Sequence, residues 1–136
     1  MSGRGVLILG PSGSGKSSLA LALLALGGRL VADDRVMLMR EGQRIMARAP
    51  APIAGLIESR GVGLIRVPHA PAEITLVVDL GQTAAERLPT PRHIDVLDRS
   101  LPLVLGPLSA HLPNSIALLL SGGRIVSGDD DQPDCE

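Results

Sequence analysis

The sequence contains no Phe, Tyr or Trp among its 136 residues. Its core must therefore be built from aliphatic side chains, and no aromatic ring is available on which a nucleic-acid base could stack. The chain has 13 Lys and Arg residues and 14 Asp and Glu residues, which gives a net charge of -1. It therefore has no general electrostatic attraction for a phosphate backbone. Both features argue against nucleic acid as a main partner.

Cysteine is also scarce, and no apolar run is long. Cys135 is the single cysteine, which excludes a disulfide within the chain and favours a reducing compartment. No stretch approaches the ~18 apolar residues that a membrane-spanning helix needs. We therefore expect a cytoplasmic protein that does not enter a membrane.

The remaining composition is that of a folded domain. Hydrophobic residues make up 45% of the chain and charged residues 20%, which is typical of a globular protein. A chain of this length is sufficient for one domain. The sequence predicts a folded domain over residues 1–127 and an acidic, disordered tail over residues 128–136.

The beginning of the chain has the pattern of a strand, a loop and a helix. Residues 6–9 form a short apolar run typical of a strand buried on both faces. Residues 16–26 are rich in Ala and Leu and are followed by two glycines, which predicts a helix. Residues 30–32 are interpreted as a second buried strand beside the first. The two acids that follow would then lie at the carboxyl edge of a parallel sheet, where ligands bind.

Later segments predict further strands. Residues 35–39 and 44–47 predict a hairpin that leaves the first sheet, and residues 74–80 predict a strong strand. Residues 115–120 fit either a strand or a helix. The less specific segments are a short helical or irregular stretch at 53–57, a glycine-containing β-rich run at 61–67, a turn or linker at 83–88, and apolar stretches at 94–97 and 101–105.

The strongest chemical signal lies between the first strand and the first helix, where the sequence matches G-x-x-x-x-G-K-[ST]. In this pattern, backbone N–H groups and the helix dipole face phosphate oxygens, Lys16 reaches the β- and γ-phosphates, and Ser17 ligates Mg²⁺. We therefore expect ATP and Mg²⁺ as cofactors. The alternative is a glycine-rich turn that precedes a helix by coincidence. The candidate nucleotide-binding residues are Gly10, Pro11, Ser12, Gly13, Ser14, Gly15, Lys16 and Ser17.

Acidic residues supply the other candidate groups. One carboxylate of the Asp33-Asp34 pair suffices for a metal ion, and the second could accept the proton of an attacking hydroxyl. The pair could instead be a helix cap and a solvated turn acid. Glu58, beside Arg60 and flexible glycines, could reach a metal and an incoming phosphate. It could equally form a surface ion pair with Arg60.

Three segments, residues 10–17, 30–36 and 57–65, resemble in order and spacing the successive blocks of the HPr kinase/phosphorylase catalytic domain. The Ala-Asp-Asp and Glu-x-Arg-Gly-x-Gly patterns are more specific than the glycine-rich motif alone. The resemblance implies an α/β fold, a P-loop nucleotide-binding domain like that of phosphoenolpyruvate carboxykinase. The short chain resembles the single-domain form of the family.

The resemblance also implies roles by motif position. Asp34 matches the proton acceptor for phosphorylation, which is the donor in the reverse reaction, and Lys16 and Arg87 match catalytic residues. Ser17 and Glu58 match magnesium ligands, with Asp33 as the further metal candidate. The implied reaction is transfer of the ATP γ-phosphoryl group to a seryl hydroxyl of HPr, a small phosphocarrier protein. The family assembles as a hexamer, so the resemblance implies that the chain forms a homo-oligomer of this kind.

Two departures weaken the expectation of reverse phosphorolysis. The family has a catalytic histidine in a strand before the glycine-rich loop, and none of His69, His93 and His111 matches it. The basic segment that the family uses for dephosphorylation has no clear match in residues 101–115. Two other functions stay open: a nucleotide-binding regulatory module without turnover, and a small-molecule kinase.

Overall fold

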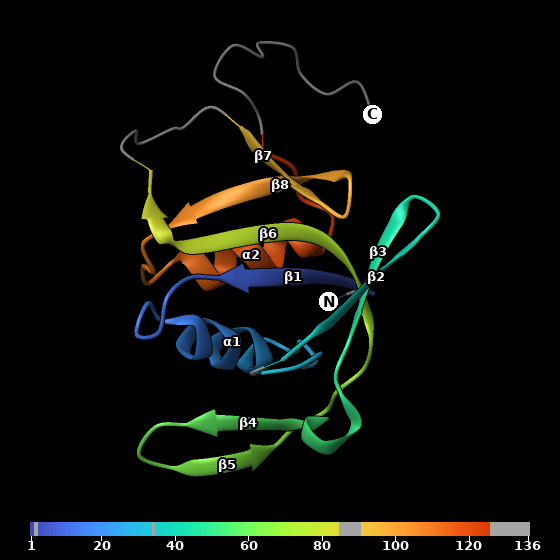
Figure 1. The fold of residues 1–136 in the computed structure, drawn as a ribbon. Coiled ribbons are helices and arrows are strands. Elements are labelled where there is room, and N and C mark those ends of the chain that lie inside the picture. Colours follow the sequence, from blue (N-terminus) through green and yellow to red (C-terminus); the bar gives the residue numbers. More distant parts are fainter. Residues whose placement is uncertain (2, 34, 85–90, 126–136) are drawn as a thin grey trace.

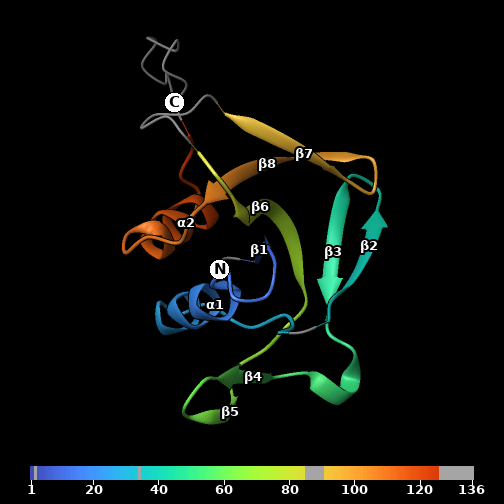
Figure 2. The same ribbon diagram turned by 60° about the vertical axis from the view of Figure 1, so that its left-hand side comes forward.

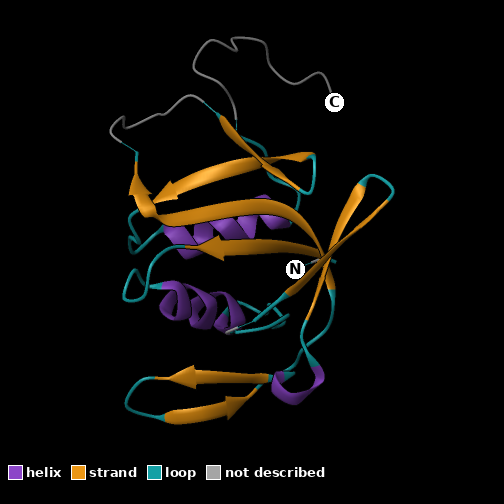
Figure 3. Ribbon diagram, in the orientation of Figure 1, coloured by secondary structure: helices purple, strands orange, loops and turns teal. Residues whose placement is uncertain are grey.

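The computed structural model describes residues 1, 3–33, 35–84 and 91–125. Within these residues the chain is a mixed α/β fold, as the sequence predicted (Figure 1, Figure 3). Its elements are β1 (Arg4–Leu9), α1 (Lys16–Ala25), β2 (Met37–Glu41), β3 (Arg44–Arg48), the 3-10 turn η1 (Ala51–Ile53), β4 (Leu56–Ser59), β5 (Gly63–Arg66), β6 (Ala72–Thr83), β7 (Arg92–Val96), β8 (Arg99–Gly106) and α2 (Leu112–Leu120).

The long strand β6 organises the main sheet. One side of β6 runs parallel to β1, with Leu9 opposite Asp79 at the end of the pairing. The other side pairs with antiparallel β3 near its start and with parallel β8 further along. β2 and β7 are the outer strands of this path. Because β1, β6 and β8 are parallel, their carboxyl ends reach one edge, at the left of Figure 1.

Aliphatic residues form a core on each face of the sheet, as the absence of aromatic residues requires. Helices α1 and α2 cover one face, while the β2–β3 hairpin and β7 curl toward the other (Figure 2). The buried residues of the helix-side core are Leu19, Leu23, Leu76, Val78, Leu80, Leu112, Ile116 and Leu120. Those of the second core are Ile45, Ala47, Ile74, Val77 and Leu101.

The strand predicted over residues 30–32, beside the first strand, is wrong. Leu30 forms only an isolated parallel bridge with His69, and β6 occupies the position next to β1. The backbone of Leu30 bonds to Pro68 O and Ala70 N instead. β6 offers 12 residues for pairing and buries side chains on both faces, so it is the stronger competitor for the edge of β1.

The remaining segments agree only in part with the elements predicted from the sequence. The predicted hairpin forms as β2 and β3, but it joins the main sheet through β3 and does not leave it. In the stretch predicted as helical or irregular over residues 53–57, Ile53 ends η1 and residues 54 and 55 form a turn, whereas Leu56 begins β4, which pairs with β5 in a separate two-stranded sheet. Residues 115–120 are helical. No helix in the described part of the chain is long and apolar enough to span a bilayer.

Replacing Ile116 with Ala should strongly destabilise the fold. This side chain is 0% exposed in the helix-side core, so its truncation leaves a cavity and should lower the free energy of unfolding by about 2–5 kcal/mol. Leu118→Ala is the control on the same helix, because Leu118 is 69% exposed and its loss should cost about 0.5 kcal/mol or less. Urea unfolding measures both. Equal losses would contradict the described packing of α2.

Candidate functional site

The glycine-rich loop, residues 10–15, joins the carboxyl end of β1 to the start of α1. Gly10, Gly13 and Gly15 have φ angles of 147°, 85° and 102°, which side-chain-bearing residues rarely adopt. The Ser14 N–H donates to the Pro11 carbonyl oxygen at 3.1 Å and closes a turn inside the loop. The glycines thus allow the chain to reverse sharply between β1, whose residues 5–9 are half-buried, and α1.

The N-terminus of α1 is free of side-chain caps. Gly15 occupies the cap position, no side chain bonds to the first turn, and that turn contains no acidic residue. Its N–H groups therefore lack the carboxylate or hydroxyl that usually satisfies them, and the helix dipole adds positive potential there. Lys16 and Ser17 are exposed in this first turn. These are the features of a helix terminus that can accept a phosphate-like anion.

Close packing holds the glycine-rich loop in shape. A Cβ atom built on Gly15 would lie 3.0 Å from Leu108 Cδ2, and one built on Gly10 would lie 2.5 Å from Ser14 Oγ. The Ser14 hydroxyl is buried and has no hydrogen-bond partner among the described residues. The loop therefore forms a tight cradle that contains one hydroxyl with unused hydrogen-bonding capacity, which fits a site for phosphate oxygens.

The second and third candidate segments meet at a hydrogen bond. The Glu58 backbone N–H donates to Asp33 Oδ2 at 3.1 Å. Glu58 lies in β4, whose Ile57 is 0% exposed. The structure thus brings Asp33 and Glu58, two of the predicted metal ligands, to one place. Asp34 and Arg87 lie outside the described residues.

The turn between β4 and β5 lies on the side of the molecule that carries the carboxyl ends of β1, β6 and β8 (Figure 1). Exposed Arg60 belongs to this turn. A hydroxyl from Ser17 and carboxylates from Asp33 and Glu58 are oxygen donors of the kind that Mg²⁺ prefers. No group of three His, Cys, Asp or Glu side chains that could hold a metal occurs within residues 1, 3–33, 35–84 and 91–125. A metal here would therefore need the Ser17 hydroxyl, phosphate oxygens or water as further ligands.

Sequence reasoning missed one acidic residue beside the glycine-rich loop. Asp79 lies in β6 directly opposite Leu9, the last residue of β1. The signal that singled out Asp33 and Asp34, an acid that ends an apolar strand, is also present here, because Asp79 follows the apolar residues 76–78. His69, His93 and His111 are all exposed.

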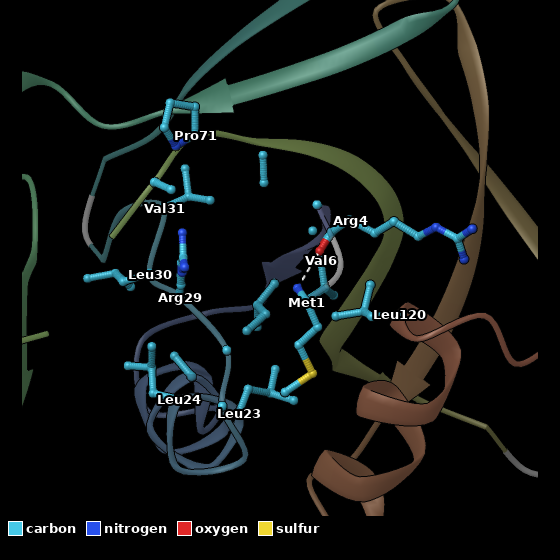
Figure 4. A pocket seen from close by; sticks show the side chains of 18 residues that line it. Met1, Arg4, Val6, Leu23, Leu24, Arg29, Leu30, Val31, Pro71 and Leu120 are labelled. Carbon is cyan, nitrogen blue, oxygen red and sulfur yellow. Dashed lines mark hydrogen bonds between the residues drawn. The ribbon is translucent and has the colours of Figure 1, made fainter. Parts of the chain in front are cut away.

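A groove of about 510 Å³ lies elsewhere on the molecule. Figure 4 shows Val6 of β1, Leu23 and Leu24 of α1, and Arg29 around it. Burial beside this groove lowers the pKa of the Met1 amino group. The groove borders the C-terminal end of α1, whereas the glycine-rich loop is at the N-terminal end of that helix. It is therefore distinct from the cradle that the glycine-rich loop forms.

Comparisons with known proteins identify relatives of the chain. Residues 1–87, more than half of its length, match the family model of the HPr serine kinase C-terminal domain. The HPr kinase/phosphorylase of Lactobacillus delbrueckii is 42% identical over 87 residues, which is 57% of this chain and 28% of that protein. The enzyme of Lactiplantibacillus plantarum is 50% identical over 66 residues, 48% of this chain and 21% of that protein. The chain thus corresponds to less than a third of these relatives' length.

The fold agrees with these sequence matches. The solved structure of the HPr(Ser) kinase/phosphatase from Coxiella burnetii superimposes with a TM-score of 0.74 and 29% sequence identity. That similarity covers 87% of this chain and 86% of the solved one, so it includes residues beyond the family-model match. The chain therefore belongs to the HPr serine kinase C-terminal domain family.

Proposed function

We propose that this chain is an ATP-dependent protein serine kinase that phosphorylates a seryl residue of the phosphocarrier protein HPr. The observation that carries the proposal is the uncapped glycine-rich cradle at the start of α1, with Lys16 in its first turn. Family membership supports the choice of substrate. The extent of the catalytic domain, residues 1–127, and self-association stay predictions.

The cradle would bind the phosphates of ATP. Backbone N–H groups of the loop and of the first turn of α1 would donate to phosphate oxygens, and the Ser14 hydroxyl has a free hydrogen-bonding position for the same purpose. The Lys16 ammonium would contact the β- and γ-phosphates and offset the charge that develops on them during transfer. The loop residues thereby fix the γ-phosphoryl group for an in-line reaction.

Ser17, Asp33 and Glu58 would hold Mg²⁺ beside these phosphates. When bound, the cation neutralises phosphate charge and helps align the phosphoryl group. The hydrogen bond from the Glu58 backbone to Asp33 supports this assignment, because it fixes one carboxylate relative to the strand that carries the other.

The substrate hydroxyl would react with the γ-phosphorus. A bond forms between the seryl oxygen and phosphorus, and the bond between phosphorus and the β–γ bridging oxygen breaks, which releases ADP. The hydroxyl proton goes to the carboxylate of Asp34, and Arg87 is proposed to stabilise the transferring group. Both assignments rest on motif position. The reverse reaction is the weaker part of the proposal, because no histidine matches the family's catalytic one.

Incubation of the chain with ATP, Mg²⁺ and purified HPr, followed by intact-mass analysis, tests the function. The expected product is HPr heavier by one phosphoryl group on serine. Nucleotide binding without transfer would instead favour a regulatory module. Transfer to metabolites that is indifferent to added HPr would favour a small-molecule kinase.

Asp33→Asn should raise the Mg²⁺ concentration that gives half-maximal transfer by about tenfold, because an amide is a weaker ligand than a carboxylate. The Asn carbonyl oxygen can still accept the Glu58 N–H, so the local fold should persist. A magnesium titration of the initial rate measures the effect. An unchanged titration curve would exclude Asp33 as a metal ligand.

A further inference from the structure

The carboxyl end of β6 contains an irregularity that lies against the glycine-rich loop. Asp79 pairs with Leu105 of β8, but the next register pair is Thr83 with Gly106, so residues 80–82 leave the regular ladder. A strand that departs from its register next to a ligand loop commonly re-aims the backbone there. The departure occurs beside Leu9, immediately before the loop begins.

The side chain of Asp79 holds this irregular segment in place. Its Oδ1 atom accepts the Gly81 backbone N–H at 2.8 Å, and its Oδ2 atom accepts the Gln82 side-chain amide at 2.8 Å. The first contact is a short turn in which an Asp side chain bonds the backbone two residues further on. Both carboxylate oxygens are therefore used to shape residues 80–82.

Gly81 in turn contacts the beginning of the glycine-rich loop. A Cβ atom built on Gly81 would lie 2.9 Å from Pro11 Cδ and 3.7 Å from Gly10 Cα. A Cβ atom built on Gly10 would lie 3.3 Å from Gly81 N. Since Pro11 is a rigid ring, the clash at 2.9 Å cannot be relieved by a rotamer change. The backbone of residue 81 is thus a surface against which the loop rests.

We propose that Asp79 and Gly81 are positioning residues for the glycine-rich loop: Asp79 fixes Gly81, and Gly81 supports Gly10 and Pro11 from behind. This inference rests on the proposed nucleotide-binding function and deepens it. Neither residue contacts the reacting atoms. Their effect is on the shape of the cradle, so changes to them alter the affinity for ATP more than the rate of transfer once ATP is bound.

A double-mutant cycle between residues 81 and 11 tests the contact. Gly81→Ala should weaken ATP binding, measured by calorimetry, about tenfold, because the added methyl displaces Pro11. Pro11→Ala removes the Cδ atom that the methyl meets. The double variant should therefore bind ATP within about threefold of Pro11→Ala alone. Additive losses would overturn the proposed contact.

Substitutions of Asp79 test how it acts. Asp79→Ala should raise KM for ATP about tenfold and leave kcat within about threefold, because two hydrogen bonds to a charged group are lost. Asp79→Asn should stay near wild type, since its amide can accept the Gly81 N–H and bond to a reoriented Gln82. Asp95→Ala is the charge-matched control on β7, opposite Ser100 at the start of β8. An equal loss in the Asn and Ala variants would overturn positioning through hydrogen bonds.

Amide exchange in the nucleotide-free protein separates this inference from the proposed function. The Ser14 N–H reports directly on the loop, because it bonds to the Pro11 carbonyl. Asp79→Ala and Gly81→Ala should accelerate its exchange about tenfold without changing amides of β7. Failure of the wild-type chain to bind ATP would refute the proposed function. The exchange rate of the Ser14 N–H would still show whether Asp79 and Gly81 hold the glycine-rich loop in place. An unchanged exchange rate of the Ser14 N–H in both variants would refute the positioning role of Asp79 and Gly81 without affecting the proposed function.

Discussion

Lys16→Ala should lower the rate of phosphoryl transfer to HPr by at least about 10²-fold, because a charged donor aimed at the transferring phosphate would be lost. Lys16 is exposed, so the substitution should leave the free energy of unfolding nearly unchanged. The initial rate of phosphoserine formation and urea unfolding measure the two effects. Loss of transfer with intact stability is the expected combination.

The lysine prediction has two informative controls. Arg48→Ala removes the same charge from an exposed position on β3, which pairs with the start of β6, away from its carboxyl end. It should keep the wild-type rate. Lys16→Arg keeps the charge but replaces a compact ammonium by a broad planar group, so it should rescue only part of the activity. Near wild-type transfer by Lys16→Ala would remove the glycine-rich loop from the reaction. The glycine-rich loop would then be a turn with a structural role only.

Asp34→Asn should reduce transfer by about 10²–10⁴-fold, the range that a positioned general base contributes. An amide has nearly the shape of the carboxylate but cannot take the seryl proton. ATP affinity should therefore stay within about twofold, and the loss should appear in kcat. Calorimetry and single-turnover rates with HPr separate binding from transfer.

The charge-matched control for this prediction is Asp95→Asn on β7, which should retain full activity. The two possible roles of Asp34 predict different losses. If Asp34 held only the metal, additional Mg²⁺ would restore much of the rate, whereas a lost proton acceptor is not replaced by salt. Rescue by Mg²⁺ would therefore reassign Asp34 as a ligand, and an unchanged rate would exclude it from the site.

The sequence predicted the local elements well and the pairing of distant ones less well. Residues 6–9 and 16–26 were recognised as a strand and a helix because apolar runs, glycines and helix-forming residues are informative over short distances. The strand expected at 30–32 failed because pairing with β1 is a competition between segments. A run of three residues offers fewer ladder bonds than β6. The β-strand propensity of residues 30–32 was therefore outweighed by the pairing of β6 with β1 in the tertiary structure.

The candidate site divides in the same way. Composition and motif alone determined an aliphatic α/β domain and predicted a phosphate-binding loop, because the strand, the glycines and the helix start lie within 20 consecutive residues. Only the tertiary structure decided that Asp33 bonds to the Glu58 backbone and that Gly81 lies against Pro11. Those contacts join residues 25 positions apart in the first case and far more in the second. The contact of Gly81 with Pro11 depends on which strand lies beside β1, and no local pattern specifies that neighbour.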